Sequence, residues 1–245
     1  MATEQGINND LLELKVLKAP IWLMTFKFKT WTLQNIEAIN QALDFLEAQT
    51  GELGLITTSD NPKIYSAGVD FSMFAQGRTH SATFLLHFQR LLARFMKLGY
   101  PTVAAINGHC FAGGIMVAMA HDFRVQRDDH GQICLSEINL GMPIPWGMLH
   151  VIQDKVPHKT TRMLAQFGHK FSPQESLEGQ LIDKLVPKET LIQACVELLA
   201  PLVEKSSVRG AFTQIKEAIN WHAIRSAEND FLPPMHLTPD NKQKL

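Results

Sequence analysis

Cysteine is scarce in this chain of 245 residues: three copies, Cys110, Cys134 and Cys195, lie far apart. Their odd number and the lack of any Cys-x-x-Cys pair argue against a disulfide framework and against a cysteine-based zinc site. The ten histidines contain no His-Glu-x-x-His motif, so no metal is expected. Because the three cysteines are unpaired in the sequence, we expect them to be reduced thiols in a reducing compartment.

Long apolar runs and an excess of one charge are also lacking. The longest apolar run, residues 111–120, is far shorter than the ~20 residues of a membrane-spanning helix, and residues 1–11 lack the apolar segment of a signal peptide. Lysine plus arginine (23) nearly balance aspartate plus glutamate (24), which argues against a nucleic-acid-binding surface. With 45% hydrophobic residues, the chain can bury the core of one large domain.

Strand and helix patterns alternate in the first half of the chain, and helical patterns dominate the second. This order predicts an α/β fold, with the main core in residues 1–200 and a helical region with a polar tail in residues 201–245. Residues 61–77 read as a loop, and two short strands around residues 127–131 read as a hairpin. The other expected strands are residues 12–18, 21–28, 53–58, 102–106 and 182–186. The expected helices are residues 33–50, 79–98, 113–121, 173–178, 187–203 and 208–221.

Two glycine-containing turns follow expected strands. The first reads Tyr-Ser-Ala-Gly-Val-Asp at residues 65–70, and the second reads Asn-Gly-His-Cys-Phe-Ala-Gly-Gly at residues 107–114. Neither has the spacing of a Rossmann or P-loop motif. Taken alone, each glycine is more simply a turn residue than a ligand contact.

These turns resemble two signatures of the crotonase superfamily, the enoyl-CoA hydratases and isomerases. The resemblance continues through residues 136–143 and 172–187 and covers roughly residues 12–205. It implies a spiral of ββα units with a helical C-terminal region, an acyl-CoA thioester as substrate, and a homotrimer or a dimer of trimers. Because CoA is part of the substrate, no separate cofactor is implied.

The resemblance also assigns roles to particular residues. By motif position, the backbone amides of Val69 and Gly113 form an oxyanion hole for the thioester oxygen. Gly113 lies at an expected helix start, where free N–H groups favour negative charge. Hydratases of the family use two glutamates; here the first position is Met116, which cannot carry a proton, and the second is Glu137, which can.

One carboxylate suits a 1,3-proton shift, so we expect a Δ3,Δ2-enoyl-CoA isomerase of fatty acid β-oxidation, closest to the plant and peroxisomal type. The alternatives are an atypical hydratase, a decarboxylase or a thioesterase of the same fold, and a non-catalytic acyl-CoA-binding protein. Without the motif context, Glu137 would read as a surface or ion-pair carboxylate.

Further residues are expected around the bound thioester. The set near the CoA and thioester is Lys63, Ser66, Ala67, Gly68 and Asp70. The set lining the acyl pocket is Met116, Phe74, His109, Leu140 and Pro143. Simpler roles stay open: Lys63 as a solvated loop residue, His109 as a structural histidine, Met116 as helix core, and Asp70 as a cap that orders its loop. The final Gln-Lys-Leu departs from the peroxisomal Ser-Lys-Leu address, so a cytoplasmic location is expected, with a peroxisomal one as the alternative.

Overall fold

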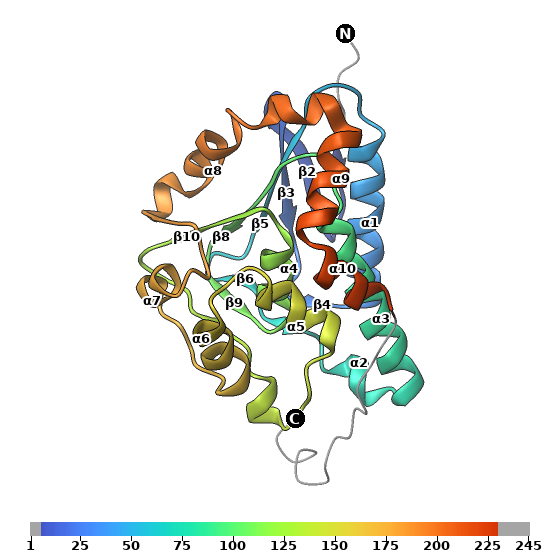
Figure 1. Cartoon of the computed structure of the whole chain (residues 1–245), viewed down its shortest axis with the longest axis vertical. Helices are drawn as coiled ribbons and strands as arrows, with labels where there is room; N and C mark the ends of the chain where they lie inside the picture. The colour runs from blue at the N-terminus through green and yellow to red at the C-terminus, as the bar shows by residue number, and fades with distance from the viewer. Residues whose placement is uncertain (1–5, 230–245) are drawn as a thin grey trace.

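The computed structural model describes residues 6–229, so the final Gln-Lys-Leu lies outside the described residues. A seven-stranded sheet in the order β1-β2-β3-β5-β8-β10-β12 forms the centre of the molecule (Figure 1). Its first three strands pair antiparallel, and the neighbours from β3 onward pair parallel. The strands are β1 (Ile7–Asn8), β2 (Leu12–Lys18), β3 (Ile21–Phe26), β5 (Gly54–Ser59), β8 (Thr102–Ile106), β10 (Phe123–Arg127) and β12 (Lys184–Val186).

Two small sheets continue the strands of the large one. The first has the order β11-β9-β6 and the second pairs β4 with β7. Strands of the large sheet are followed by strands of a small sheet, as β3 by β4, β5 by β6, β8 by β9 and β10 by β11. A helix follows in the first three cases, which gives the expected spiral of ββα units. The strands are β4 (Thr30–Trp31), β6 (Ile64–Ser66), β7 (Gly68–Val69), β9 (His109–Phe111) and β11 (Ile133–Cys134).

The large sheet is buried on both faces, as parallel sheets usually are. Along β3, Trp22 and Met24 join one apolar cluster with α1 and α3, while Ile21 and Leu23 join a second cluster with α8. Figure 1 shows α8 on one side of the sheet and α1 with α3 on the other. The helices are α1 (Leu33–Glu47), α2 (Ser72–Ala75), α3 (Arg78–Phe95), α4 (Gly113–Ala120), α5 (Trp146–Gln153), α6 (His158–Thr161), α7 (Pro173–Glu178), α8 (Leu191–Leu199), α9 (Arg209–Ile219) and α10 (Trp221–Glu228).

Local capping chemistry sets two helix starts where the sequence predicts them. Thr32 caps α1 in a reciprocal pair of hydrogen bonds with Asn35. Ser172 caps α7 in the same way with Glu175, and Pro173 occupies the first helical position, where its missing N–H costs nothing. These boundaries are encoded within a few residues, so sequence patterns find them.

The hairpin prediction around residues 127–131 is wrong. Strand β10 is paired on both edges, with β8 and β12, whereas β11 joins β9 in the small sheet. The chain between them crosses from one sheet to the other. Arg127 holds this crossing, since its guanidinium pairs with Asp129 and donates to the Pro62 and Asn107 carbonyls.

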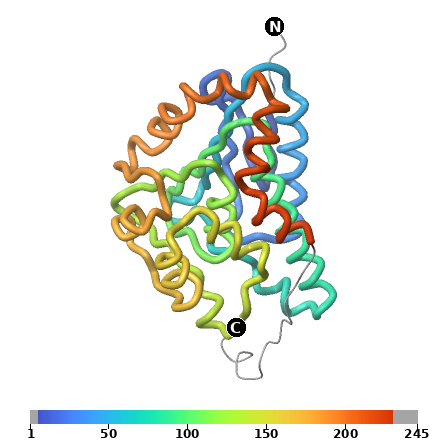
Figure 2. Tube along the Cα trace, in the orientation of Figure 1, coloured from blue at the N-terminus to red at the C-terminus, as the bar shows by residue number. Residues whose placement is uncertain are grey.

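The segment predicted as a loop at residues 61–77 contains β6, β7 and the short helix α2. The helix predicted over residues 208–221 is confirmed as α9, whereas α10, which follows it after Asn220, is not predicted by the sequence patterns. Helix α10 packs on α3 and α5, and Figure 2 shows the C-terminal helices running beside α1 and α3. Within residues 6–229, no helix is long and apolar enough to cross a membrane.

Candidate active site

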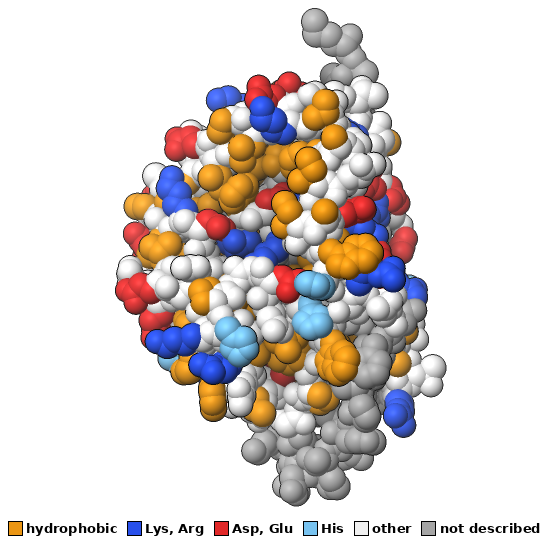
Figure 3. Space-filling view, in the orientation of Figure 1, with side chains coloured by type: hydrophobic (Ala, Val, Ile, Leu, Met, Phe, Trp, Pro, Cys, Tyr) orange, Lys and Arg blue, Asp and Glu red, His pale blue; other side chains and the backbone are white. Residues whose placement is uncertain are grey.

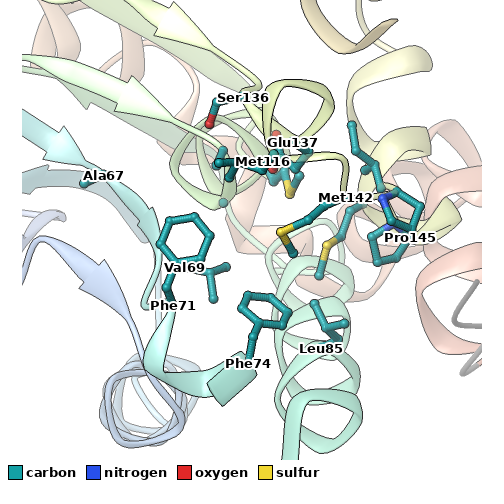
Figure 4. A pocket seen from close by; sticks show the side chains of 16 residues that line it. Ala67, Val69, Phe71, Phe74, Leu85, Met116, Ser136, Glu137, Met142 and Pro145 are labelled. Atoms are coloured by element: carbon teal, nitrogen blue, oxygen red, sulfur yellow. The ribbon is translucent and has the colours of Figure 1, made fainter. Parts of the chain in front are cut away.

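A pocket opens between the small sheets, helices α2 to α5, and the segment that joins β11 to α5 (Figure 4). It holds about 570 Å³ of empty space, including the part open to solvent. Its wall is formed by Ala67, Val69, Phe71, Phe74, Leu85, Ala112, Gly113, Met116, Ser136, Glu137, Leu140, Met142, Pro143, Ile144, Pro145 and Met148. Of these side chains, only Glu137 is ionisable at ordinary pH.

Glu137 starts a short 3₁₀ helix, Glu137–Leu140, directly after Ser136. Gly141 ends this helix in the left-handed region at φ 65°, and the Met142 N–H returns to the Glu137 carbonyl at 2.9 Å. The turn therefore holds Glu137 against the pocket. Its Oε2 atom is buried and has no hydrogen-bond partner among the described residues. Because burial penalises the charged form, the pKa of Glu137 is raised to about 7.

Two backbone segments approach each other across the pocket from Glu137. A Cβ atom placed on Gly113 would lie 3.3 Å from Val69 Cγ2, and one placed on Gly68 would lie 3.5 Å from the Gly113 nitrogen. Gly68 also has φ 97°, which a side chain would strain. Gly113 is the first residue of α4, where N–H groups have no partner within the helix. The Val69 and Gly113 backbones thus border the same pocket as the Glu137 carboxyl.

Ala112 makes the sharp turn into α4 with φ 47° and ψ −119°, a combination that only glycine adopts easily. Its N–H donates to the Cys134 carbonyl at 2.8 Å, and its own carbonyl accepts from the Ile115 and Met116 amides. These three bonds hold a strained residue in the pocket wall. Ala112 stands directly before the Gly-Gly pair, but an alanine gives no sequence signal of such a turn.

Asp70 and Ser66 lie outside the pocket lining and stabilise the turn at residues 65–70. The Asp70 carboxylate accepts from the Ser72 N–H at 2.9 Å and from the Thr30 hydroxyl at 3.3 Å. Hydrogen bonding with the Ser72 side chain, the Ser72 N–H and Thr30 lowers the pKa of Asp70. The buried Ser66 hydroxyl accepts from the Gly68 N–H at 3.2 Å. Both side chains order the loop that carries Val69.

Lys63 and His109 also lie outside the lining. The His109 N–H donates to the Lys63 carbonyl at 2.8 Å, and the Lys63 side chain is exposed. The His109 ring contacts Phe111 and His130 and accepts from the Gln132 N–H at 3.2 Å. Its pKa is lowered by burial. The His109 ring therefore has a structural role, and it lies three residues before Ala112, which does line the pocket.

Of the set expected near the CoA and thioester, Ala67 lines the cavity and Gly68 does not. Of the set expected to line the acyl pocket, Phe74, Met116, Leu140 and Pro143 all do so. The sequence reading missed the loop residues Met142, Ile144 and Pro145, as well as Ser136, Leu85 on α3 and Met148 on α5. Leu85 falls on the apolar stripe of its helix, so sequence alone could not separate it from the core. Within residues 6–229, no group of acidic, histidine or cysteine side chains is arranged to hold a metal ion.

Comparison with known proteins agrees with this architecture. A human mitochondrial enoyl-CoA delta isomerase 1 is 30% identical over 187 residues, which cover 74% of this chain and 62% of the human protein. Enoyl-CoA delta isomerase 3 of Arabidopsis thaliana is 28% identical over 192 residues, covering 75% of this chain and 80% of the plant protein. The chain thus matches less than two thirds of the human relative's length.

A solved structure titled as an enoyl-CoA isomerase of Mycobacterium tuberculosis superposes with a TM-score of 0.81 at 19% identity, covering 90% of this chain and 96% of the other. This likeness shows the crotonase fold that the sequence predicted. The profile of the enoyl-CoA hydratase/isomerase family matches residues 19–232. The chain therefore belongs to the enoyl-CoA hydratase/isomerase family.

Proposed function

We propose that this protein isomerises 3-enoyl-CoA thioesters to 2-trans-enoyl-CoA, a step in the β-oxidation of unsaturated fatty acids. The observation that carries the proposal is that, among the residues that the structure describes, Glu137 is the one ionisable side chain in a mostly apolar pocket. A 1,3-proton shift needs one group that accepts a proton and returns it. The relatives named as enoyl-CoA delta isomerases support the same reaction.

In the proposed reaction, the thioester oxygen accepts hydrogen bonds from the Val69 and Gly113 amides. The Glu137 carboxylate removes a proton from C2 of the 3-enoyl chain, and the electrons move into a dienolate. Glu137 then returns the proton to C4, which leaves the double bond between C2 and C3. Backbone donors aimed at the oxygen stabilise the developing negative charge, and each contributes on the order of 3 kcal/mol.

The environment of Glu137 suits this role. A general base works best when its pKa lies near the working pH, and burial raises the pKa of Glu137 to about 7. Hydration would need a second group to activate water, and Met116 occupies the position that the family resemblance assigns to it. The apolar wall also disfavours an ordered water beside the dienolate.

The proposed proton shift leaves the oxidation state of the substrate unchanged, so it needs no redox group, and CoA enters as part of the substrate. We also propose that the protein works as a homotrimer or a dimer of trimers in the cytoplasm, with a peroxisomal location as the alternative. Sedimentation of the purified protein and imaging of a tagged chain test these two points separately.

The deciding experiment is a panel of CoA thioesters with product identification by chromatography and mass spectrometry. We expect conversion of 3-hexenoyl-CoA to 2-trans-hexenoyl-CoA, with slower hydration of crotonyl-CoA and no loss of CO₂ from malonyl-CoA. Faster hydration than isomerisation would show that the protein is a hydratase. Binding of every thioester without turnover would show a non-catalytic acyl-CoA-binding protein.

A further inference from the structure

A second cleft lies between α9 and the region where α4 ends and β10 begins. Its wall is formed by Asp122, Arg124, Lys155, Phe212, Ile215, Lys216, Ile219 and Asn220. It holds about 790 Å³ of empty space, including the part open to solvent, and shares no residue with the candidate active site. Helix α4 separates the two, with Gly113 at one end and His121 just past the other, so about 12 Å of helix lies between them.

The cleft brings together more positive than negative charge. Lys216 pairs with Asp122 at 2.7 Å, and Arg124 pairs with Asp183 at 2.7 Å. The Lys155 ammonium donates to the His121 carbonyl at 2.8 Å and forms no ion pair with a carboxylate in the part of the chain that the structure describes. When Lys155 is protonated, three cations face two carboxylates, and one positive charge has no counterion.

The buried Arg124 and the half-buried Lys155 show the same imbalance. Arg124 is 5% exposed, and its Nε atom has no hydrogen-bond partner among the described residues. Burial, reinforced by the neighbouring Arg124, lowers the pKa of Lys155 to about 7, although Asp122 and Asp183 oppose the shift. Buried polar groups without partners are costly. An anion bound between Lys155 and Arg124 would remove both defects.

The opposite wall of the cleft is apolar. Phe212, Ile215 and Ile219 follow one another on a single face of α9, and Ile215 and Ile219 are 62% and 75% exposed. On the face drawn in Figure 3, hydrophobic side chains gather over α8 and α9, with basic side chains beneath them. An occupant that matches both walls has an apolar part and one negative charge.

We propose that this cleft binds an aliphatic monocarboxylate. The carboxylate accepts hydrogen bonds from the two unused N–H groups of Lys155, beside the Arg124 guanidinium, and the hydrocarbon chain lies against Phe212, Ile215 and Ile219. One carboxylate balances the single excess charge, whereas a doubly charged phosphate would reverse it. The site is independent of the reaction proposed for the Glu137 pocket.

Calorimetric titration of the full chain with sodium hexanoate tests the proposal, with hexan-1-ol as the uncharged ligand and acetate as the ligand without a chain. We expect one hexanoate per chain and at least tenfold weaker binding of both comparison ligands. Lys155→Met keeps the stem but removes the ammonium, and it should weaken hexanoate binding at least tenfold. Thermal melts verify that each variant is folded.

A second pair of variants checks the apolar wall. Ile215 is exposed, so Ile215→Glu should fold normally and place its own carboxylate over the cations, which blocks hexanoate; Ile215→Gln, of matched size, should block far less. The proposal is overturned by an absence of hexanoate binding up to ~10 mM, or by binding that Lys155→Met and Ile215→Glu leave intact. It is also overturned if Ile215→Glu lowers the sedimenting mass, because a second copy of the chain then occupies this face.

Discussion

Phe88 lies directly behind Gly113: a Cβ atom placed on Gly113 would be 3.0 Å from Phe88 Cζ and 3.4 Å from Cε1. Even a methyl group there must push the ring or shift the start of α4. If the start of α4 shifts and the ring does not, the Gly113 N–H changes direction.

Gly113→Ala should therefore lower the isomerisation rate by ~10²-fold, as expected for one misplaced oxyanion donor. Stopped assays of 3-hexenoyl-CoA conversion measure the loss, and a thermal melt checks the fold. Val69→Ala, which keeps its N–H, should change the rate only modestly. A folded, fully active Gly113→Ala protein together with an inactive Val69→Ala protein would refute the assignment of the two amides.

Glu137→Gln should reduce the isomerisation rate by ~10²–10⁴-fold, the usual contribution of a general base. The amide keeps the size of the side chain but cannot accept the C2 proton. Acyl-CoA binding, measured by calorimetry, should remain close to that of the native protein. Near-native turnover by this variant would remove Glu137 from the mechanism.

The pH dependence of the reaction should report the same group. The raised pKa of Glu137, about 7, means that the carboxyl is protonated and inactive as a base below that pH. The value of kcat/KM for 3-hexenoyl-CoA should therefore rise through pH 7 and level off above it. A flat profile between pH 5.5 and 8.5 would contradict a buried Glu137 base.

The stability of the folded protein should fall as pH rises, whereas kcat/KM should increase. An acid whose pKa is higher in the folded state binds more protons when folded, so stability is lost as pH rises from the unfolded value of 4.5 to the folded value of about 7. The loss for Glu137 is on the order of 3 kcal/mol above pH 7. Glu137→Gln should therefore melt at a higher temperature than the native protein at pH 8 and at nearly the same temperature at pH 4.5.

The predictable parts of the molecule are those encoded locally. Thr32 and Ser172 cap their helices through residues three positions away, and the motif positions of Val69, Gly113 and Glu137 converge on one pocket. The hairpin prediction for β10 is wrong because the residues of a short strand do not determine which strands it pairs with. That choice is made by β8 and β12, which are distant in sequence.

The electrostatic features were hidden for a related reason. The pKa of Glu137 depends on the depth of its burial, which the apolar side chains around it create. The excess charge beside Arg124 comes from Lys155, which lies about thirty residues further along the chain and joins the cleft only in the folded protein. No pattern within one segment encodes either property.

Met116→Glu tests whether a carboxyl at position 116 is coupled electrostatically to Glu137. Both side chains line the same apolar cavity, so a second carboxylate there would be close to Glu137 in a region of low polarity. Like charges disfavour joint ionisation and raise the pKa of one of the pair. The pH profile of isomerisation should move to higher pH, and the rate at pH 7 should fall. Met116→Gln, which adds polarity without charge, should leave the midpoint near pH 7. An unshifted profile for a folded Met116→Glu protein would contradict this expectation and show that the introduced carboxyl, not Glu137, takes the raised pKa.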